Sequence, residues 1–394
     1  MTTATAPSAA DLMTARQATD PYPIFDALRQ ETPFRAGGGM PGQGSLWPLM
    51  RYHDVYAALK DHETFSSAGR DGGGQFLVLI NNDPPRHTRF RKLVSKAFTP
   101  RRIAELEPWI QQTSDELFDA LGKGEVEAVE GYTMPLPVKA IAKLLGIPGE
   151  EYVTFKRWTD SLLSFGDAEK DAAARGQDMM EMFQYFAKMA SLRREHGAQD
   201  LITALVEAET DEGKLEDWEV IGFCILLLVA GNETTTNLMG NMLNHLAHDP
   251  ALFATLKADR DLIPQALEEM VRYESPVQVL FRTTLKDAVL PSGGRIPAGE
   301  SVGIYYGAAN RDPGGWGEDA NTYRLDRDLK DHVGFGHGIH YCLGSPLARA
   351  EARITVNNLL DRFDRLTPGA TPGVRQASSP IVYGFKTLAL TLGG

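Results

Sequence analysis

The apolar residues of the chain recur mainly at the spacing of amphipathic helices. Residues 218–248 form the longest such run and predict the longest helix. Residues 103–196 are also predicted to be mostly helical, with breaks near the glycines at 122–124 and 146–149. An earlier helix is expected to start at Asp20 and Pro21 and to reach Leu28, because aspartate caps helix N-termini and proline suits the first turn. Helices therefore dominate the expected structure.

Short extended segments are expected mainly in the last third of the chain. Residues 289–302 carry turn signals at 292–294 and 297–299 between short apolar pieces, which predicts short strands. Residues 277–281 are largely apolar and follow a helix-ending Ser-Pro pair, so they are also expected to be extended. One further strand is predicted near the N-terminus, at residues 46–50.

Charge and composition narrow the class of protein. The 394 residues carry a formal net charge of -12, which argues against nucleic-acid binding because phosphate neutralisation needs a basic surface. The longest uncharged stretch, residues 220–232, is shorter than the roughly 20 apolar residues of a membrane span. Residues 1–18 are expected to be a flexible leader rather than a signal peptide, followed by a single domain over residues 19–394. The chain has only two cysteines, Cys224 and Cys342, so no disulfide framework is expected, which fits a cytoplasmic location. The protein is expected to be a monomer.

The most informative stretch is residues 335–344, a glycine-containing loop followed by a helical run over residues 345–360. Gly336 and Gly338 can take backbone angles closed to other residues, and the loop delivers Cys342 to the start of a helix. Unpaired N–H groups and the helix dipole at that point are expected to favour the thiolate, the form in which cysteine binds a metal. A cysteine taken alone is more often a small buried structural residue.

The loop resembles the cysteine-ligand loop of the cytochrome P-450 superfamily of haem-thiolate monooxygenases. The matching positions are Phe335, Gly336, Gly338, His340, Cys342 and Gly344. The resemblance implies that Cys342 is the axial ligand of the iron of haem b, that His340 bonds to a haem propionate, and that Phe335 and Gly336 border the cofactor. A thiolate ligand pushes electron density onto iron and favours O–O cleavage. The implied fold is mainly α with a smaller β-rich region, a triangular prism with haem between the distal helix and this loop.

A second motif interrupts the longest predicted helix. Residues 230–236 read Ala-Gly-Asn-Glu-Thr-Thr-Thr, although glycine costs about 1 kcal/mol relative to alanine in a helix and threonine is a poor helix former. A threonine hydroxyl can bond to the carbonyl four residues earlier and bend the helix, while Gly231 leaves room for a small molecule. The string resembles the oxygen-activation motif of the family, which implies that Glu233 and Thr234 deliver protons. Without the resemblance, residues 230–236 would be interpreted as a distortion of the helix with an exposed glutamate.

Three cationic side chains match propionate-binding positions of the family. His87 and Arg91 lie four residues apart on a predicted helix that runs to residue 98, so they share one face where cations can hold carboxylates. Alone, such a pair is more often a solvated basic face. The resemblance implies that His87, Arg91 and Arg282 all bind haem propionates.

One cluster is expected to be structural. Glu269 and Arg272 share a helical face, and an exposed pair of this kind is worth less than about 1 kcal/mol. The resemblance joins this pair to Arg327, from a later irregular segment, and implies that the three fix the chain that leads into the cysteine loop.

The resemblance also suggests where substrate and electron donor bind. A glycine-rich loop at residues 66–75, the extended segment after the Ser-Pro pair and a hairpin at residues 381–385 would line an apolar pocket. The pocket candidates are Phe76, Leu77, Val279, Leu280, Phe281 and Val382. A basic patch beside the cysteine side of the haem would receive an acidic electron-donor protein. Its candidates are Arg89, Lys92, Lys96, Arg101, Arg102, Arg349 and Arg353.

The expected activity is insertion of one atom of dioxygen into a small apolar organic substrate, with electrons from NAD(P)H through a reductase and a ferredoxin. A peroxide-driven peroxygenase would share Cys342 but would not need the Glu233 and Thr234 pair. A zinc site at His337, His340 and Cys342 would crowd three ligands into a glycine loop and leave the other motifs unexplained. Terpenes, fatty acids, aromatic acids and macrolides all remain open as substrates.

Overall fold

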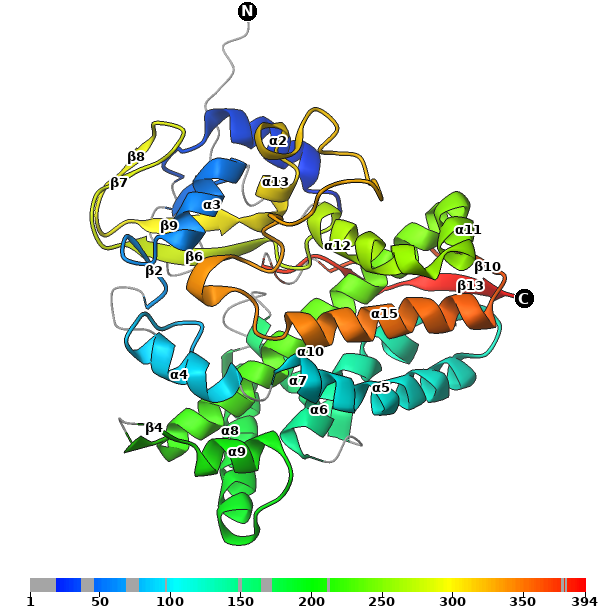
Figure 1. The fold of residues 1–394 in the computed structure, drawn as a ribbon, viewed down its shortest axis with the longest axis horizontal. Helices are drawn as coiled ribbons and strands as arrows, with labels where there is room; N and C mark the ends of the chain where they lie inside the picture. Colours follow the sequence, from blue (N-terminus) through cyan, green and yellow to red (C-terminus); the bar gives the residue numbers. More distant parts are fainter. Residues whose placement is uncertain are drawn as a thin grey trace, which may run out of the picture.

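The computed structural model describes residues 19–36, 46–68, 78–95, 98–147, 151–163, 172–210, 213–376, 379 and 381–394; the candidates Phe76, Leu77 and Lys96 lie outside these ranges. The fold is mainly helical, as the sequence predicts (Figure 1). The helices are α2 (Tyr22–Glu31), α3 (Tyr52–Lys60), α4 (Arg86–Val94), α5 (Pro100–Leu121), η2 (Val129–Thr133), α6 (Pro135–Leu145), α7 (Tyr152–Leu163), α8 (Ala172–His196), α9 (Leu201–Glu207), α10 (Asp217–His248), α11 (Pro250–Ala258), η4 (Arg260–Leu262), α12 (Ile263–Tyr273), α13 (Tyr306–Asn310), α14 (Pro313–Trp316), η5 (Gly338–His340) and α15 (Ser345–Arg362).

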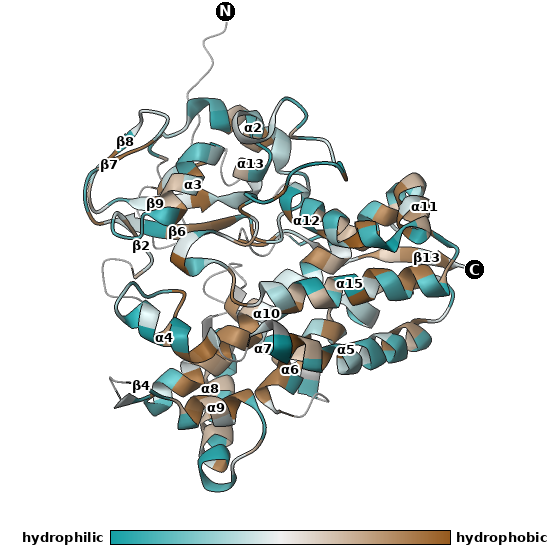
Figure 2. Cartoon of the chain, in the orientation of Figure 1, coloured by the Kyte–Doolittle hydropathy of each residue, from teal (hydrophilic) through white to brown (hydrophobic). Residues whose placement is uncertain are grey.

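Helix α10 is the element against which most other helices pack. It begins where predicted because Glu216 and Glu219 form a capping box, in which each side chain accepts a hydrogen bond from the other residue's backbone N–H. Its residues are apolar on nearly all sides, which is the pattern of a buried helix, and α6, α7, α8, α9, α11, α12 and α15 surround it. By length and composition α10 could cross a membrane, but most of it is buried inside the protein. Figure 2 shows that hydrophobic residues, coloured brown, occur along this helix.

The strands form small sheets beside the helices. They are β1 (Leu46–Leu49), β2 (Phe65–Ser66), β3 (Gly124–Glu127), β4 (Glu209–Thr210), β5 (Gly213–Lys214), β6 (Val279–Thr284), β7 (Ala288–Val289), β8 (Arg295–Ile296), β9 (Ser301–Tyr305), β10 (Arg365–Pro368), β11 (Val374–Arg375), β12 (Phe385–Thr387) and β13 (Ala389–Gly393). The largest sheet has the order β1-β9-β6-β2, with β1 parallel to β9 and the other pairs antiparallel. A second sheet has the order β10-β13-β3.

Helix α4 ends earlier than the predicted residue 98. The Ser95 hydroxyl donates to the carbonyl of Arg91 at 2.6 Å, and the Phe98 N–H turns back to the carbonyl of Ser95. Thr99 then caps α5 by accepting a hydrogen bond from the Arg102 N–H. Thr99 therefore begins a new helix soon after α4 ends, a boundary that the apolar periodicity alone does not reveal.

A buried carboxyl on α15 gives a testable pH dependence. Glu351 is 1% exposed, its Oε2 atom has no hydrogen-bond partner among the described residues, and burial raises its pKa to about 8. Since the folded protein then holds a proton that the unfolded chain releases, stability falls as pH rises from the ordinary value of 4.5 towards about 8.

Glu351→Gln is expected to remove this dependence. Across that window the variant's free energy of unfolding should fall less steeply than that of the unmodified protein, by about 1.4 kcal/mol per pH unit. Denaturant unfolding at a series of pH values measures the two slopes. Equal slopes would show that Glu351 is ionised in the folded protein.

Candidate active site

The cysteine loop is held by its glycines and by one backbone hydrogen bond. Gly336 and Gly338 have φ values of 73° and 68°, in the left-handed region that the sequence predicts for them. A Cβ on Gly338 would also lie 2.5 Å from the Leu59 carbonyl oxygen, so α3 approaches the loop too closely for another residue. The Cys342 N–H donates to the Phe335 carbonyl at 2.8 Å, which closes the loop just before α15.

The protein alone does not favour the Cys342 thiolate, contrary to the expectation from the helix start. Burial raises the pKa of the thiol, and the opposing contributions of the Gly344 and Ser345 N–H groups and of the Arg91 charge are smaller in sum. A coordinated metal ion deprotonates a thiol outright. The site therefore has a sulfur ligand that becomes an anion when metal binds.

Four ionisable side chains lie beside the loop: His87, Arg91, Arg282 and His340. The rings of His87 and His340 are 4.4 Å apart. Burial lowers the pKa of His340 to about 2 and that of His87 to about 4; the charges of Arg282, His87 and Arg91 add to the shift of His340, and that of Arg91 adds to the shift of His87. Arg282 is 7% exposed and donates to the Phe281 carbonyl and the Tyr306 hydroxyl rather than to a carboxylate.

These four residues fit an anionic ligand. Buried like charges are unfavourable unless an anion joins them, and the Nε2 atom of His87 is buried without a partner among the described residues. The two propionates of haem supply two carboxylates, which matches the site by charge. His340 Nε2 lies 3.0 Å from the Ser67 hydroxyl, and His337 packs its ring on Tyr56. In the part of the chain that the structure describes, no group of three metal-ligating side chains forms, so the zinc alternative is not supported.

The oxygen-activation motif lies in the middle of α10, which continues unbroken through it. The Thr234 hydroxyl donates to the Ala230 carbonyl at 2.9 Å, as the sequence predicts. Ala230 is exposed and Gly231 and Thr234 are half-buried, whereas the other residues around them on the helix are buried, so these three mark the open face of α10. A Cβ on Gly231 would instead lie 3.4 Å from Ile141 of α6. That is an ordinary van der Waals contact, so the expectation that Gly231 leaves room for a small molecule stays a prediction.

Lys156 of α7 is a site residue that the sequence did not reveal. Its Nζ lies 3.2 Å from Oε2 of Glu233, and it also pairs with Asp160. Burial would lower the pKa of Lys156, but the charges of Glu233 and Asp160 outweigh burial and raise it. Glu233 is buried and not exposed, so the ion pair with Lys156 is what allows a carboxylate there.

Comparison with known proteins identifies the family. Residues 137–385 match the family model described as Cytochrome P450. The protein Cytochrome P450 107B1 of Saccharopolyspora erythraea is 40% identical over 370 residues, which cover 88% of this chain and 89% of that protein. The chain belongs to the cytochrome P450 family. As a P450 it is a haem-dependent monooxygenase, and the resemblance of the cysteine loop is confirmed.

Two further relatives support the same assignment. Vitamin D(3) 25-hydroxylase of Pseudonocardia autotrophica is 35% identical over 396 residues, covering 97% of this chain and 96% of that protein. The crystal structure of CYP109E1 from Bacillus megaterium in complex with testosterone has a TM-score of 0.87 at 34% identity, covering 97% of this chain and all of that chain. The predicted P450 fold is therefore confirmed.

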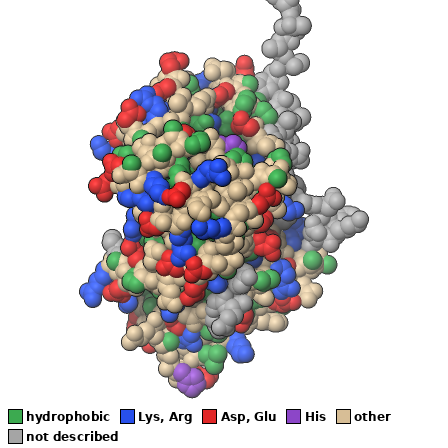
Figure 3. Space-filling view, turned by 90° about the vertical axis from the view of Figure 1, so that its right-hand side faces the viewer, with side chains coloured by type: hydrophobic (Ala, Val, Ile, Leu, Met, Phe, Trp, Pro, Cys, Tyr) green, Lys and Arg blue, Asp and Glu red, His purple; other side chains and the backbone are tan. Residues whose placement is uncertain are grey.

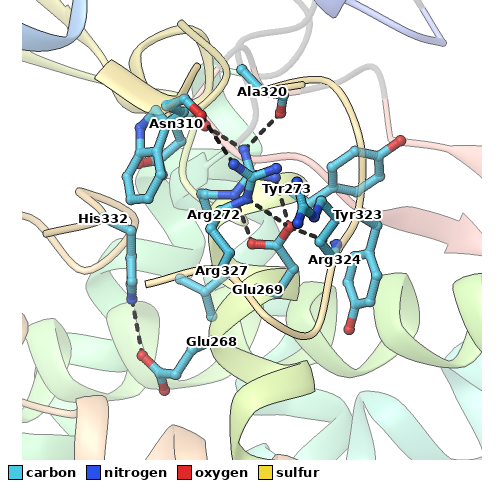
Figure 4. Close-up of polar contacts among 12 residues, drawn as sticks. Glu268, Glu269, Arg272, Tyr273, Asn310, Ala320, Tyr323, Arg324, Arg327 and His332 are labelled. Atoms are coloured by element: carbon cyan, nitrogen blue, oxygen red, sulfur yellow. Dashed lines mark hydrogen bonds and ion pairs between the residues drawn. The ribbon is translucent and has the colours of Figure 1, made fainter. Parts of the chain in front are cut away.

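The structural cluster of this P450 is formed as its sequence predicts (Figure 4). Glu269 and Arg272 are both 0% exposed and share two hydrogen bonds of 2.7 and 2.8 Å. Arg327 Nε lies 3.4 Å from Oε1 of Glu269. Arg272 also donates to the carbonyls of Asn310 and Ala320, both at 2.7 Å. The cluster thus ties α12 to the irregular chain that precedes the cysteine loop.

The expected P450 substrate pocket is only partly supported. Adjacent side chains of a strand point to opposite faces, so Val279 and Phe281 cannot share a face with Leu280 and Arg282. Val279 is fully buried in an apolar cluster with α2, and Phe281 packs against that cluster. Of the three pocket candidates on this strand, Leu280 is the one that lies on the same face as Arg282. Val382 is buried and forms a bridge with Val277, so the C-terminal segment does return to the chain after α12, as expected.

The expected basic docking patch is largely neutralised. Each arginine proposed for it forms an ion pair with a glutamate; the pairs are Arg89–Glu219, Arg101–Glu105, Arg102–Glu105, Arg349–Glu268 and Arg353–Glu107. The Arg89 side chain is only 13% exposed, whereas Lys92 is exposed. Figure 3 shows the face that lies on the right-hand side of Figure 1; on it, basic (blue) and acidic (red) side chains are also interspersed.

Proposed function

We propose that this P450 inserts one atom of dioxygen into a bulky apolar organic substrate in the cytoplasm, as a monomer that receives electrons from NAD(P)H through a ferredoxin reductase and a ferredoxin. The observation that carries the proposal is the combination of the half-buried Cys342 loop with a cluster of two arginines and two histidines suited to haem propionates. Haem, when bound through Cys342, supplies the thiolate-ligated iron at which dioxygen is activated.

The residues of α10 supply protons in this proposal. Thr234 Oγ1 lies on the open face of the helix, where its hydroxyl proton would be available for transfer once haem is bound. Glu233, buried one position earlier, is held in place by Lys156. An ionisable group beside a hydroxyl is what a proton relay needs. A peroxygenase would not need this pair, which is why dioxygen is preferred as the oxidant.

The substrate class is inferred from the relatives and from the apolar residues near Arg282. Structures of CYP109E1 contain corticosterone and testosterone, and those chains are 36% and 34% identical to this one. In this chain, the apolar side chains proposed for the pocket come from Val277, Leu280 and Val382, and Val277 and Val382 are paired in a β-bridge. We therefore propose rigid apolar molecules of steroid size as the first substrates to test, with fatty acids and macrolides as comparison sets.

The test uses purified protein supplied with haem. The reduced, carbon-monoxide-bound form should show the long-wavelength absorption band of thiolate-ligated haem, and steroids should shift the resting spectrum at lower concentrations than fatty acids. Oxygenation should require NAD(P)H, a ferredoxin and its reductase. Protein that binds no haem would overturn the proposal, and efficient turnover with peroxide alone would identify a peroxygenase instead.

Thr234→Ala is expected to uncouple electron flow from oxygenation. Without the hydroxyl, NAD(P)H consumption should continue while product per NAD(P)H falls several-fold and hydrogen peroxide appears in its place. The matched control is Thr236→Ala, because the Thr236 hydroxyl is buried and contacts Asn232 instead of the open face. Full coupling in the Thr234 variant would remove this residue from the relay.

A further inference from the structure

A second charge cluster lies beside the structural cluster, on the neighbouring residue of α12. Glu268 accepts two hydrogen bonds from Arg349 of α15, at 2.5 and 2.9 Å. His332 Nδ1 accepts a hydrogen bond from the Gly334 N–H, so in the neutral ring Nε2 carries the proton and donates to Glu268 at 2.9 Å. Figure 4 shows the His332 ring directed at the Glu268 carboxylate.

Both partners of Glu268 contact the cysteine loop. The Arg349 guanidinium carbon lies 4.4 Å from the centre of the Phe335 ring, and Arg349 also donates to the Tyr341 hydroxyl at 3.3 Å. The ring of His332 lies 5.9 Å from that of Phe335. Phe335 is the residue whose carbonyl accepts the Cys342 N–H. One carboxylate therefore orients two side chains that contact the loop, both at Phe335 and one also at Tyr341.

Glu268 is ionised whenever the protein is folded at neutral pH. Burial alone would raise its pKa, but hydrogen bonds from Arg349 and His332 outweigh burial and hold the pKa at about 2. The two-bond geometry to Arg349 is one that a planar guanidinium makes and that lysine cannot reproduce. Arg349 is thereby directed inward at the loop instead of outward at a partner protein.

We propose that Glu268 is a positioning residue that, through Arg349 and His332, clamps Phe335 onto the cysteine loop and so keeps the Cys342 sulfur in its ligating position. The inference rests on the proposed role of Cys342 as haem ligand. This role differs from that of the Glu269 cluster, in which Arg272 binds the carbonyls of Asn310 and Ala320 instead.

The decisive experiment is the spectrum of the reduced, carbon-monoxide-bound protein. Glu268→Gln should bind haem but show a several-fold larger share of the short-wavelength band that marks loss of the thiolate ligand, and its reduction potential should shift. Arg349→Lys should show the same change, because it keeps the charge but loses the two-bond geometry. Glu268→Asp should restore part of the normal band.

The matched control is Glu274→Gln. Glu274 follows the same helix and pairs with Arg375 at 3.0 Å in a more buried ion pair, but its partner contacts Tyr383 and Phe385 rather than the loop. This control should keep the normal band even if its melting temperature falls. If Glu268→Gln and Arg349→Lys melt earlier but keep an unchanged band and potential, the role is merely structural and the inference fails. If the unmodified protein itself lacks the thiolate band, the proposed function fails instead.

Discussion

Replacing Arg272 by methionine is expected to lower the free energy of unfolding by about 3–5 kcal/mol, because it leaves a buried carboxylate without its main partner. Glu269 is 0% exposed and would keep the Arg324 N–H, which donates to Oε1 at 2.9 Å, and Arg327, whose Nε is 3.4 Å away. The carbonyls of Asn310 and Ala320 would also lose their donor. The loss approaches the total stability of many domains, which is about 5–15 kcal/mol. Denaturant unfolding, with haem loss and helix content followed together, measures it.

A surface ion pair is the control for this prediction. Lys330 and Asp328 are 3.3 Å apart, and their side chains are 85% and 72% exposed. Lys330→Met should therefore change the free energy of unfolding by less than about 1 kcal/mol. An Arg272→Met protein that is as stable as the Lys330 variant would show that the Glu269 charge is neutralised in another way.

Features set by local sequence were predicted well. The positive φ values of Gly336 and Gly338 follow from residue type, and the span of α10 follows from an apolar run that starts at a capping box and ends before Pro250. The pairing of Glu269 with Arg272 follows from their spacing on one helix. In each case the residues that decide the structure lie within a few positions of one another.

Features set by long-range packing were missed. Lys156 reaches Glu233 from a helix 77 residues away, and nothing in its own neighbourhood marks it. The pairing of Arg349 with Glu268 spans 81 residues and changes an expected docking residue into one that faces the loop. Sequence gives the charge of a side chain, but its partner depends on which elements the fold brings together.

Two predictions left out a competing effect. The helix start at Cys342 does favour a thiolate, but burial of the sulfur has the larger effect on its pKa. The extended segment after α12 was expected to direct Val279, Leu280 and Phe281 into one pocket, although strand geometry sends neighbours to opposite faces. Alternation within that segment could have corrected the second prediction from the sequence.

Cys342→Ser is expected to reduce oxygenation to the background of a reaction without enzyme. Serine is nearly the same size, so it fits the loop, but its hydroxyl is a much weaker electron donor to iron than a thiolate, and O–O cleavage depends on that donation. The variant should also lose the long-wavelength band of the reduced, carbon-monoxide-bound form. Spectra and product analysis on the same preparations measure both effects.

The matched control for this substitution is the other cysteine. Cys224 is fully buried in α10, and burial raises its pKa, so it is a small apolar core residue with no part in ligation. Cys224→Ala should keep the thiolate band and most of the activity, at a modest loss of stability. If the Cys342 variant kept the thiolate band while the Cys224 variant lost it, the haem ligand would be Cys224 and not Cys342. Because the cationic cluster and the loop glycines surround Cys342 alone, the reverse pattern is expected.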